Sequence, residues 1–114
     1  MKEFVYDSIH DDIQYIIRVG ENAQENWDLI DESSQNDLWF HVEGFPSCHV
    51  VLCVGDRRKS PHKTVINFCA SLCKEGSKMS NCKNIKIIYT EIKHVTKADL
   101  VGAVHTKNTR IVKI

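Results

Sequence analysis

The chain has 114 residues, 42% of them hydrophobic and 26% charged, a composition typical of a single globular domain over residues 1–114. Its formal net charge is zero, which at first argues against a nucleic-acid partner. No apolar run approaches the roughly 20 residues of a membrane helix, and the start, MKEFVYDSIHDD, lacks the apolar core of a signal peptide. These features argue against a membrane segment and predict a cytoplasmic protein.

The zero net charge conceals an asymmetry between the two halves of the chain. Residues 1–50 hold eleven Asp and Glu against two Lys and Arg, a net charge of −9. Residues 51–114 hold thirteen Lys and Arg against four Asp and Glu, a net charge of +9. Either the halves pack together and neutralise each other, or the second half forms a basic surface. Both alternatives stay open, because only the fold places these charges.

The amino-terminal part is expected to form two strands followed by a helix. Residues 3–8 and 12–19 have the composition and alternation of strands, and one face of the second carries Ile13, Tyr15 and Ile17. A helix is expected over residues 21–33, with an inner face made of Ala23, Trp27 and Ile30. Asn22 and Asn26 lie one helical turn apart, where their amides suit either helix capping or a small hydrogen-bonding platform.

Two apolar runs, LWFHV and CHVVLCV, come next and predict strands over residues 38–43 and 48–54, joined by the turn EGFPS. Each run carries one histidine, and we expect His41 and His49 to lie on the same sheet face as a cross-strand pair. Such a pair suits structural histidines, a nucleotide-binding surface, or the acid and base of a small ribonuclease. Cys48 points to the other face, so His49 cannot activate it as a nucleophile.

The second half begins with the polar loop GDRRKS, whose densest basic run is Arg57, Arg58 and Lys59. A helix should follow, with Ser60 as its N-cap and Pro61 as its first position, ending near Lys74 or Ser77. Further strands are expected over residues 84–90 and near residues 91–95, 103–106 and 109–113. The whole pattern predicts an α+β fold, a mostly antiparallel sheet with two helices packed against it.

The five cysteines are an odd number set among apolar residues, which indicates reduced thiols in an intracellular compartment. Cys69 and Cys73 stand one helical turn apart and Cys82 follows the helix, but no standard zinc-ligand spacing is present. Cys69 also belongs to the apolar stripe of the second helix, where a thiol behaves as a small hydrophobe. We therefore expect neither a metal nor a cofactor.

Six motifs follow one another in a recognisable order: VGENAQENWDLI, DLWFHV, PSCHVVL, IKIIYT, IKHVTKADLVGAV and TRIVKI. As an ordered set over about residues 15–114, they resemble the NFACT-R family. This RNA-binding domain occurs in ribosome-quality-control factors that add C-terminal tails to stalled nascent chains, and alone in small coiled-coil-containing proteins. The run from Gly20 through Leu52 is most similar to those small proteins.

The resemblance assigns candidate RNA-binding residues. The family's Asn-Ala-x-x-Asn segment matches Asn22 and Asn26, its Asp-Leu-Trp-x-His matches residues 37–41, and its Ser-His-Val matches residues 48–50 without the serine. Its Tyr-Thr and Lys-x-Val-x-Lys segments match Tyr89, Thr90, Lys93, Val95 and Lys97. The chain departs from the family at Glu21, where an arginine is frequent, at Ser47 in place of glycine, and at Val101-Gly102 in place of Pro-Gly. Glu21 weakens the expectation of phosphate binding near the first helix.

The resemblance implies a non-enzymatic RNA-binding module that contacts tRNA or ribosomal RNA in the rescue of stalled ribosomes. His41 and His49 would meet a nucleotide, and Lys93 and Lys97 its phosphates. The basic loop of Arg57, Arg58 and Lys59 is a further candidate contact, expected to matter less than the lysine pair. The alternatives are a DNA-binding or protein adaptor module, with the ribosome as a further partner, and a small histidine-dependent ribonuclease. The family's ribosome-gripping parts are not in these 114 residues, so we expect the chain to lack tailing activity.

Overall fold

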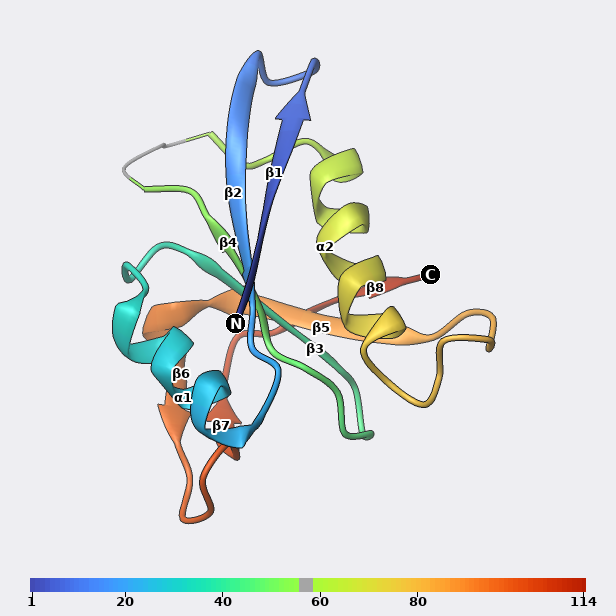
Figure 1. Cartoon of the computed structure of the whole chain (residues 1–114). Helices are drawn as coiled ribbons and strands as arrows, with labels where there is room; N and C mark the ends of the chain where they lie inside the picture. The colour runs from blue at the N-terminus through green and yellow to red at the C-terminus, as the bar shows by residue number, and fades with distance from the viewer. Residues whose placement is uncertain (56–58) are drawn as a thin grey trace.

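The computed structural model describes residues 1–55 and 59–114, which are drawn in Figure 1 as helices, strands and loops. Within these ranges the helices are α1 (Ala23–Glu32) and α2 (Lys63–Glu75), with one 3-10 turn, η1 (Ile92–His94). The strands are β1 (Lys2–Ser8), β2 (Ile13–Val19), β3 (Leu38–Val42), β4 (Val50–Cys53), β5 (Lys86–Glu91), β6 (Val95–Lys97), β7 (Val104–Thr106) and β8 (Arg110–Lys113). No helix in the described ranges combines the length and the apolar character needed to cross a membrane.

Six strands form one sheet in the order β1-β2-β4-β3-β5-β8, and β6 and β7 form a separate hairpin. All of these pairings are antiparallel. The predicted α+β fold, a mostly antiparallel sheet with two helices, is therefore confirmed. The strand order places β1 and β2, blue in Figure 1, at one edge of the sheet and β5 and β8, orange and red, at the other.

The two helices cover opposite faces of the sheet. Since successive residues of a strand point to opposite sides, each helix packs against a different set of strand side chains. On one face, α2 buries Val65, Cys69 and Cys73 in a cluster with inward residues of the central strands. On the other face, α1 buries Leu29 against Trp39 and a smaller set of apolar side chains. The predicted inward face of β2, Ile13, Tyr15 and Ile17, is confirmed as part of the α2-side core.

The predicted inner face of α1 was right only for Ile30, which packs against the α1-side core, since Ala23 is exposed. The buried residues of the helix are Asn26 and Leu29, whereas Trp27 is half-buried on its flank. Trp27 turns toward the β6–β7 hairpin, where its indole N–H donates a hydrogen bond to the carbonyl oxygen of Ala103 at 2.9 Å. A hairpin that comes from more than seventy residues further along the chain thus shifts which side of α1 is buried.

The predicted start of α2 was also wrong. His62, and not Ser60, is the N-cap, and its Nδ1 accepts the backbone N–H of Thr64 at 3.2 Å. The backbone N–H of His62 donates to the Asp11 carboxylate at 3.0 Å, which holds this part of the chain outside the helix. The helix therefore begins at Lys63, two residues later than Pro61.

Two strand boundaries also differ from the sequence-based expectation. The fourth strand begins at Val50 rather than at residue 48, so His49 directly precedes it. The strand expected near residues 91–95 is divided, because β5 runs on to Glu91 and η1 then turns the chain before β6.

Gly20 gives a test of how α1 is seated on the sheet. A Cβ at this position would clash with Asn26 Oδ1, the atom that accepts the backbone N–H of His49. We expect Gly20→Ala to displace the Asn26 side chain and leave a buried N–H unpaired. The free energy of unfolding, measured in urea, should fall by about 1–3 kcal/mol.

Asn26→Ala and the double variant complete a cycle for this contact. Since the alanine at position 20 acts mainly by displacing Asn26, the double variant should be less destabilised than the sum of the two single variants. Strict additivity would contradict this explanation of the glycine.

Candidate functional site

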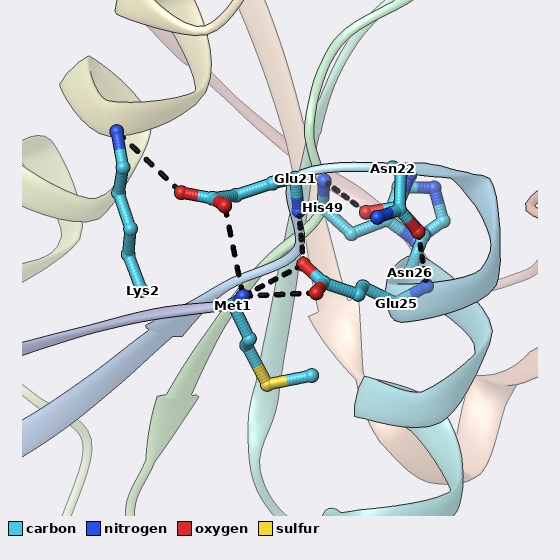
Figure 2. A network of polar contacts seen from close by, with 7 residues as sticks. All are labelled: Met1, Lys2, Glu21, Asn22, Glu25, Asn26 and His49. Atoms are coloured by element: carbon cyan, nitrogen blue, oxygen red, sulfur yellow. Dashed lines mark hydrogen bonds and ion pairs between the residues drawn. The ribbon is translucent and has the colours of Figure 1, made fainter.

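Asn22 and Asn26, both candidates from the sequence, have structural partners at the start of α1, as Figure 2 shows. Asn22 Oδ1 accepts the backbone N–H of Glu25 at 2.9 Å and so caps the helix. Asn26 is buried, and its Oδ1 accepts the backbone N–H of His49 at 3.2 Å. Of the two alternatives for these amides, the geometry favours capping and packing, and RNA contact by either remains a prediction.

The start of α1 is also a site of charge pairing (Figure 2). The Met1 ammonium lies 2.9 Å from the Glu25 carboxylate and 3.7 Å from that of Glu21, which also lies 3.6 Å from Lys2 Nζ. The hydrogen bond from this ammonium lowers the pKa of Glu25 below its ordinary value. Two carboxylates thus balance two cations here, and no excess positive charge is left for a phosphate.

The paired histidines lie on the same sheet face, as predicted. The register of β3 against β4 pairs Phe40 with Val50, and its continuation sets His41 opposite His49. The centroids of their rings are 5.2 Å apart, and the ring planes are nearly perpendicular at 86°. The short EGFPS turn therefore preserves the register that the sequence suggested.

His49 is an interior residue, with 3% of its surface exposed. Its Nδ1 accepts the indole N–H of Trp39 at 3.1 Å. Burial and, to a smaller extent, the charge that His41 would carry together lower the pKa of His49 to about 3. The ring is therefore neutral at physiological pH, and its placement favours the structural alternative over contact with a nucleotide.

His41 is half-buried, and its Nδ1 donates to the carbonyl oxygen of Val42 at 2.6 Å. Its ring is parallel to that of Trp39, with centroids 5.6 Å apart. Burial also lowers the pKa of His41, against a smaller opposing effect of the hydrogen bond to Val42. The ribonuclease alternative needs one protonated and one neutral histidine near neutral pH. A pair in which both pKa values are lowered does not supply the acid.

The role of Asp37, the first residue of the family-like Asp-Leu-Trp segment, was missed by sequence reasoning. Its side chain is buried, with 3% exposed, and accepts backbone N–H groups from Ser34 at 2.9 Å, Val54 at 2.9 Å and Gly55 at 3.3 Å. It thereby ties the start of β3 to the end of β4. An acidic residue directly before an apolar strand was the only available signal.

Lys93 and Lys97 are accessible, but each contacts a carboxylate. Lys93 Nζ lies 3.1 Å from the Glu91 carboxylate, and Lys97 Nζ lies 2.7 Å from that of Asp31 and 5.3 Å from the centroid of the Trp27 ring. A phosphate would have to compete with these partners.

The basic loop falls partly outside the residues that the structure describes. Arg57 and Arg58 lie outside the described residues. Lys59 is exposed and lines a cavity on the α2 side of the sheet, away from the two histidines.

All five cysteines are free thiols. Burial raises the pKa of the Cys69 and Cys73 thiols, which belong to the core beneath α2. Within residues 1–55 and 59–114, no three or more His, Cys, Asp or Glu side chains come together in a way that suits a metal ion.

The buried His49 ring should make the stability of the protein depend on pH. The unfolded chain binds a proton at His49 below about pH 6.5, whereas the folded protein does so only near pH 3. The free energy of unfolding should therefore fall as the pH drops through this window, by up to about 1.4 kcal/mol per pH unit. Urea unfolding at a series of pH values between about 7 and 5 measures this slope.

The matched control is His49→Asn. The asparagine can offer Oδ1 to the Trp39 N–H but does not titrate, so the pH slope of the variant should be smaller than that of the unmodified chain. Equal slopes would show that another group dominates the pH dependence.

The comparisons with known proteins agree with this fold. The family described as the NFACT protein RNA binding domain matches residues 2–108. A solved structure, the C-terminal part of the fibronectin/fibrinogen-binding protein from Streptococcus suis, has a TM-score of 0.83 at 26% identity, covering 100% of this chain and 45% of that chain.

Two curated relatives extend the comparison. Coiled-coil domain-containing protein 25 from Bos taurus is 36% identical over 106 residues, which are 88% of this chain and 50% of that protein. The Rqc2 homolog RqcH from Bacillus subtilis is 30% identical over 82 residues, which are 71% of this chain and 14% of that protein. The chain spans about half the length of the coiled-coil relative. By its match over residues 2–108, this chain belongs to the NFACT RNA-binding domain family.

Proposed function

We propose that the chain is a non-enzymatic RNA-binding module that acts in ribosome quality control, with tRNA or ribosomal RNA as its ligand. Its family supports RNA as the ligand, and its similarity to the Rqc2 homolog RqcH supports the process. The chain spans only part of these relatives. We therefore also propose, rather than conclude, that the ribosome is a partner and that the protein is cytoplasmic, as expected from the sequence.

The fold places much of the acidic half and much of the basic half at opposite edges and faces of the sheet, although α2 packs on β1 and the backbone N–H of its N-cap, His62, donates to Asp11. β1, β2 and α1 belong to the acidic half, whereas α2, β5 and β8 belong to the basic half. The two sets of strands occupy opposite edges of the sheet, and the two helices cover opposite faces. Within residues 1–55 and 59–114, a single ion pair, Lys97 with Asp31, joins the two halves. Direct pairing therefore does not neutralise the basic half.

The observation that carries the proposal is this set of unpaired cations. In the described range 59–114, Lys93 and Lys97 are the only Lys or Arg that form an ion pair. The exposed cations without such a partner fall into two groups. Lys59, Lys63, Lys86, Arg110 and Lys113 lie just before or at the start of α2 or on the strands β5 and β8, whereas Lys78, Lys83 and Lys107 lie in loops and are not proposed as RNA contacts. Cations gathered on one side of a protein attract a polyanion and gain further from the release of its counterions.

A direct binding measurement tests the function. The purified chain should bind labelled tRNA or a ribosomal RNA fragment saturably, with an affinity that falls as salt rises. An RNA competitor should displace the probe better than DNA of the same sequence. Equal competition by DNA would favour the DNA-binding alternative, and discrete RNA cleavage products would contradict a non-enzymatic module.

Lys93 and Lys97 remain proposed phosphate contacts. We expect Lys93→Ala/Lys97→Ala to weaken RNA binding. The loss of two full phosphate contacts to a single strand would lower the salt slope by about 1.4, and the decrease in this variant should be smaller. The effect is reduced because both ammonium groups already contact carboxylates. Fluorescence anisotropy of a labelled RNA over a range of salt concentrations gives both quantities.

Two variants frame this prediction. Lys78→Ala/Lys83→Ala removes the same charge from an exposed loop and should leave binding closer to that of the unmodified chain. His41→Ala should weaken binding without changing the salt slope, because a neutral ring releases no counterions. A lysine-pair variant that is indistinguishable from the loop control would show that the two lysines do not contact RNA.

A further inference from the structure

A cavity of about 820 Å³ opens on the α2 side of the sheet, over β5 and β8. Its floor includes Tyr89 and Arg110, which are paired across β5 and β8 and so share one sheet face. Lys63 and Asn67 from the start of α2 lie on the opposite side, and Lys59 lies at the rim. The volume falls within the roughly 300–1,000 Å³ of typical ligand sites.

The cavity exists because α2 does not extend over the whole sheet. The helix packs on β1, β3, β4 and β5, whereas β8 is the edge strand beyond them. The delayed start of α2 at Lys63 also leaves the extended chain before it as one wall, contributed by Ser60 and Pro61.

The cations that line this cavity have no ion-pair partners. Lys59, Lys63 and Arg110 are exposed, and no ion pair within the described residues involves any of them. The acidic residue in the lining is Glu91, whose carboxylate already contacts Lys93. The first turn of α2 carries no acidic residue of its own, but the positive end of the helix already faces the Asp11 carboxylate, which accepts the backbone N–H of His62, so the three cations are the charges that remain without a partner. Mutual repulsion among these groups would be relieved by a bound anion.

The cavity also offers an aromatic ring and several amides. Tyr89 is half-buried and stacks on Phe40, with ring centroids 5.3 Å apart and an interplanar angle of 15°. Such support holds the ring in one orientation, which suits stacking with a base. Amide side chains can both donate to and accept from base edges, and those in the lining belong to Asn36, Asn67 and Asn108.

We propose that this cavity binds a single-stranded segment of RNA, with phosphates at Lys59, Lys63 and Arg110 and a base against Tyr89. The inference rests on the proposed RNA-binding function and adds a contact region on the α2 side of the sheet to the contacts proposed for Lys93, Lys97 and His41. A cationic rim alone would suit any polyanion. The cavity also holds the Tyr89 ring, which Phe40 supports, and several asparagine amides. These groups favour unpaired nucleotides, whose bases are free to stack, over a duplex or an acidic peptide.

The test compares two variants that lose the same charge. Lys63→Ala/Arg110→Ala removes two exposed cations of the cavity, and Lys78→Ala/Lys83→Ala removes two exposed lysines outside its lining. Binding of a labelled single-stranded RNA is measured by anisotropy over a range of salt concentrations. The cavity variant should bind about tenfold more weakly than the control, with a salt slope lower by about 1.4. Circular dichroism checks that both variants are folded.

The outcomes separate this inference from the proposed function. If the unmodified chain binds no RNA, the function itself fails. If it binds RNA but the two variants bind alike, the function stands and the cavity is not the site. A preference for duplex RNA, or displacement of the RNA by an acidic peptide at equal concentration, would also overturn the assignment to a single strand.

A second measurement locates the RNA without any substitution. Single-stranded RNA carrying 4-thiouridine is photocrosslinked to the unmodified chain, and the modified peptides are identified by mass spectrometry. We expect the crosslink on the segment that contains Tyr89. Crosslinks confined to α1 or to the β6–β7 hairpin would place the RNA on the other face of the sheet and contradict the proposal.

Discussion

Three side chains under α1, those of Trp39, His49 and Asn26, take part in a buried chain of hydrogen bonds that fixes the helix on the sheet. The Trp39 indole donates to the His49 ring, and the His49 backbone donates to the Asn26 amide. Because all three residues are buried, an unpaired group in this chain would cost about 1–3 kcal/mol. These hydrogen bonds require that His49 Nδ1 carries no proton. Burial favours this neutral ring by lowering the pKa of His49, which is about 3. The neutral His49 ring that these hydrogen bonds need, and that helps to hold α1 in place, cannot act as a general acid near neutral pH.

The position of α1 on the sheet determines where the carboxylates of this helix lie relative to the cations of the second half of the chain. With the helix fixed on one face, its carboxylates are separated by the sheet from the cations of α2. Asp31 nevertheless contacts a cation of the basic half, Lys97, on the hairpin that packs beside the helix. Trp27 adds to this contact, because its ring lies under the Lys97 ammonium and its N–H bonds to the hairpin. The ion pair between Lys97 and Asp31, which alone joins the two halves within the described residues, thus depends on how the hairpin packs on α1.

The sequence predicted those features that depend on short-range pattern. Alternation identified the inward face of β2, and a short turn set His41 opposite His49, because both follow from strand geometry over a few residues. The features it missed depend on distant partners. The inner face of α1 was shifted by Ala103, and the start of α2 by the Asp11 carboxylate. The cavity could not be predicted either, because it depends on the register of β5 with β8 and on the position of α2 relative to these strands. No local sequence pattern encodes these two features.

A net charge of zero is compatible with binding a polyanion when the fold separates the charges far enough. Neighbouring strands are roughly 4.8 Å apart, and five such spacings separate β1 from β8, a distance on the order of 24 Å. At physiological salt the screening length is about 8 Å, so charges at the acidic edge are largely screened from a ligand at the basic edge. A phosphate there responds to Arg110 and Lys113 on the edge strand rather than to the sum over the chain. The order of the strands, more than the composition, therefore determines what this protein attracts.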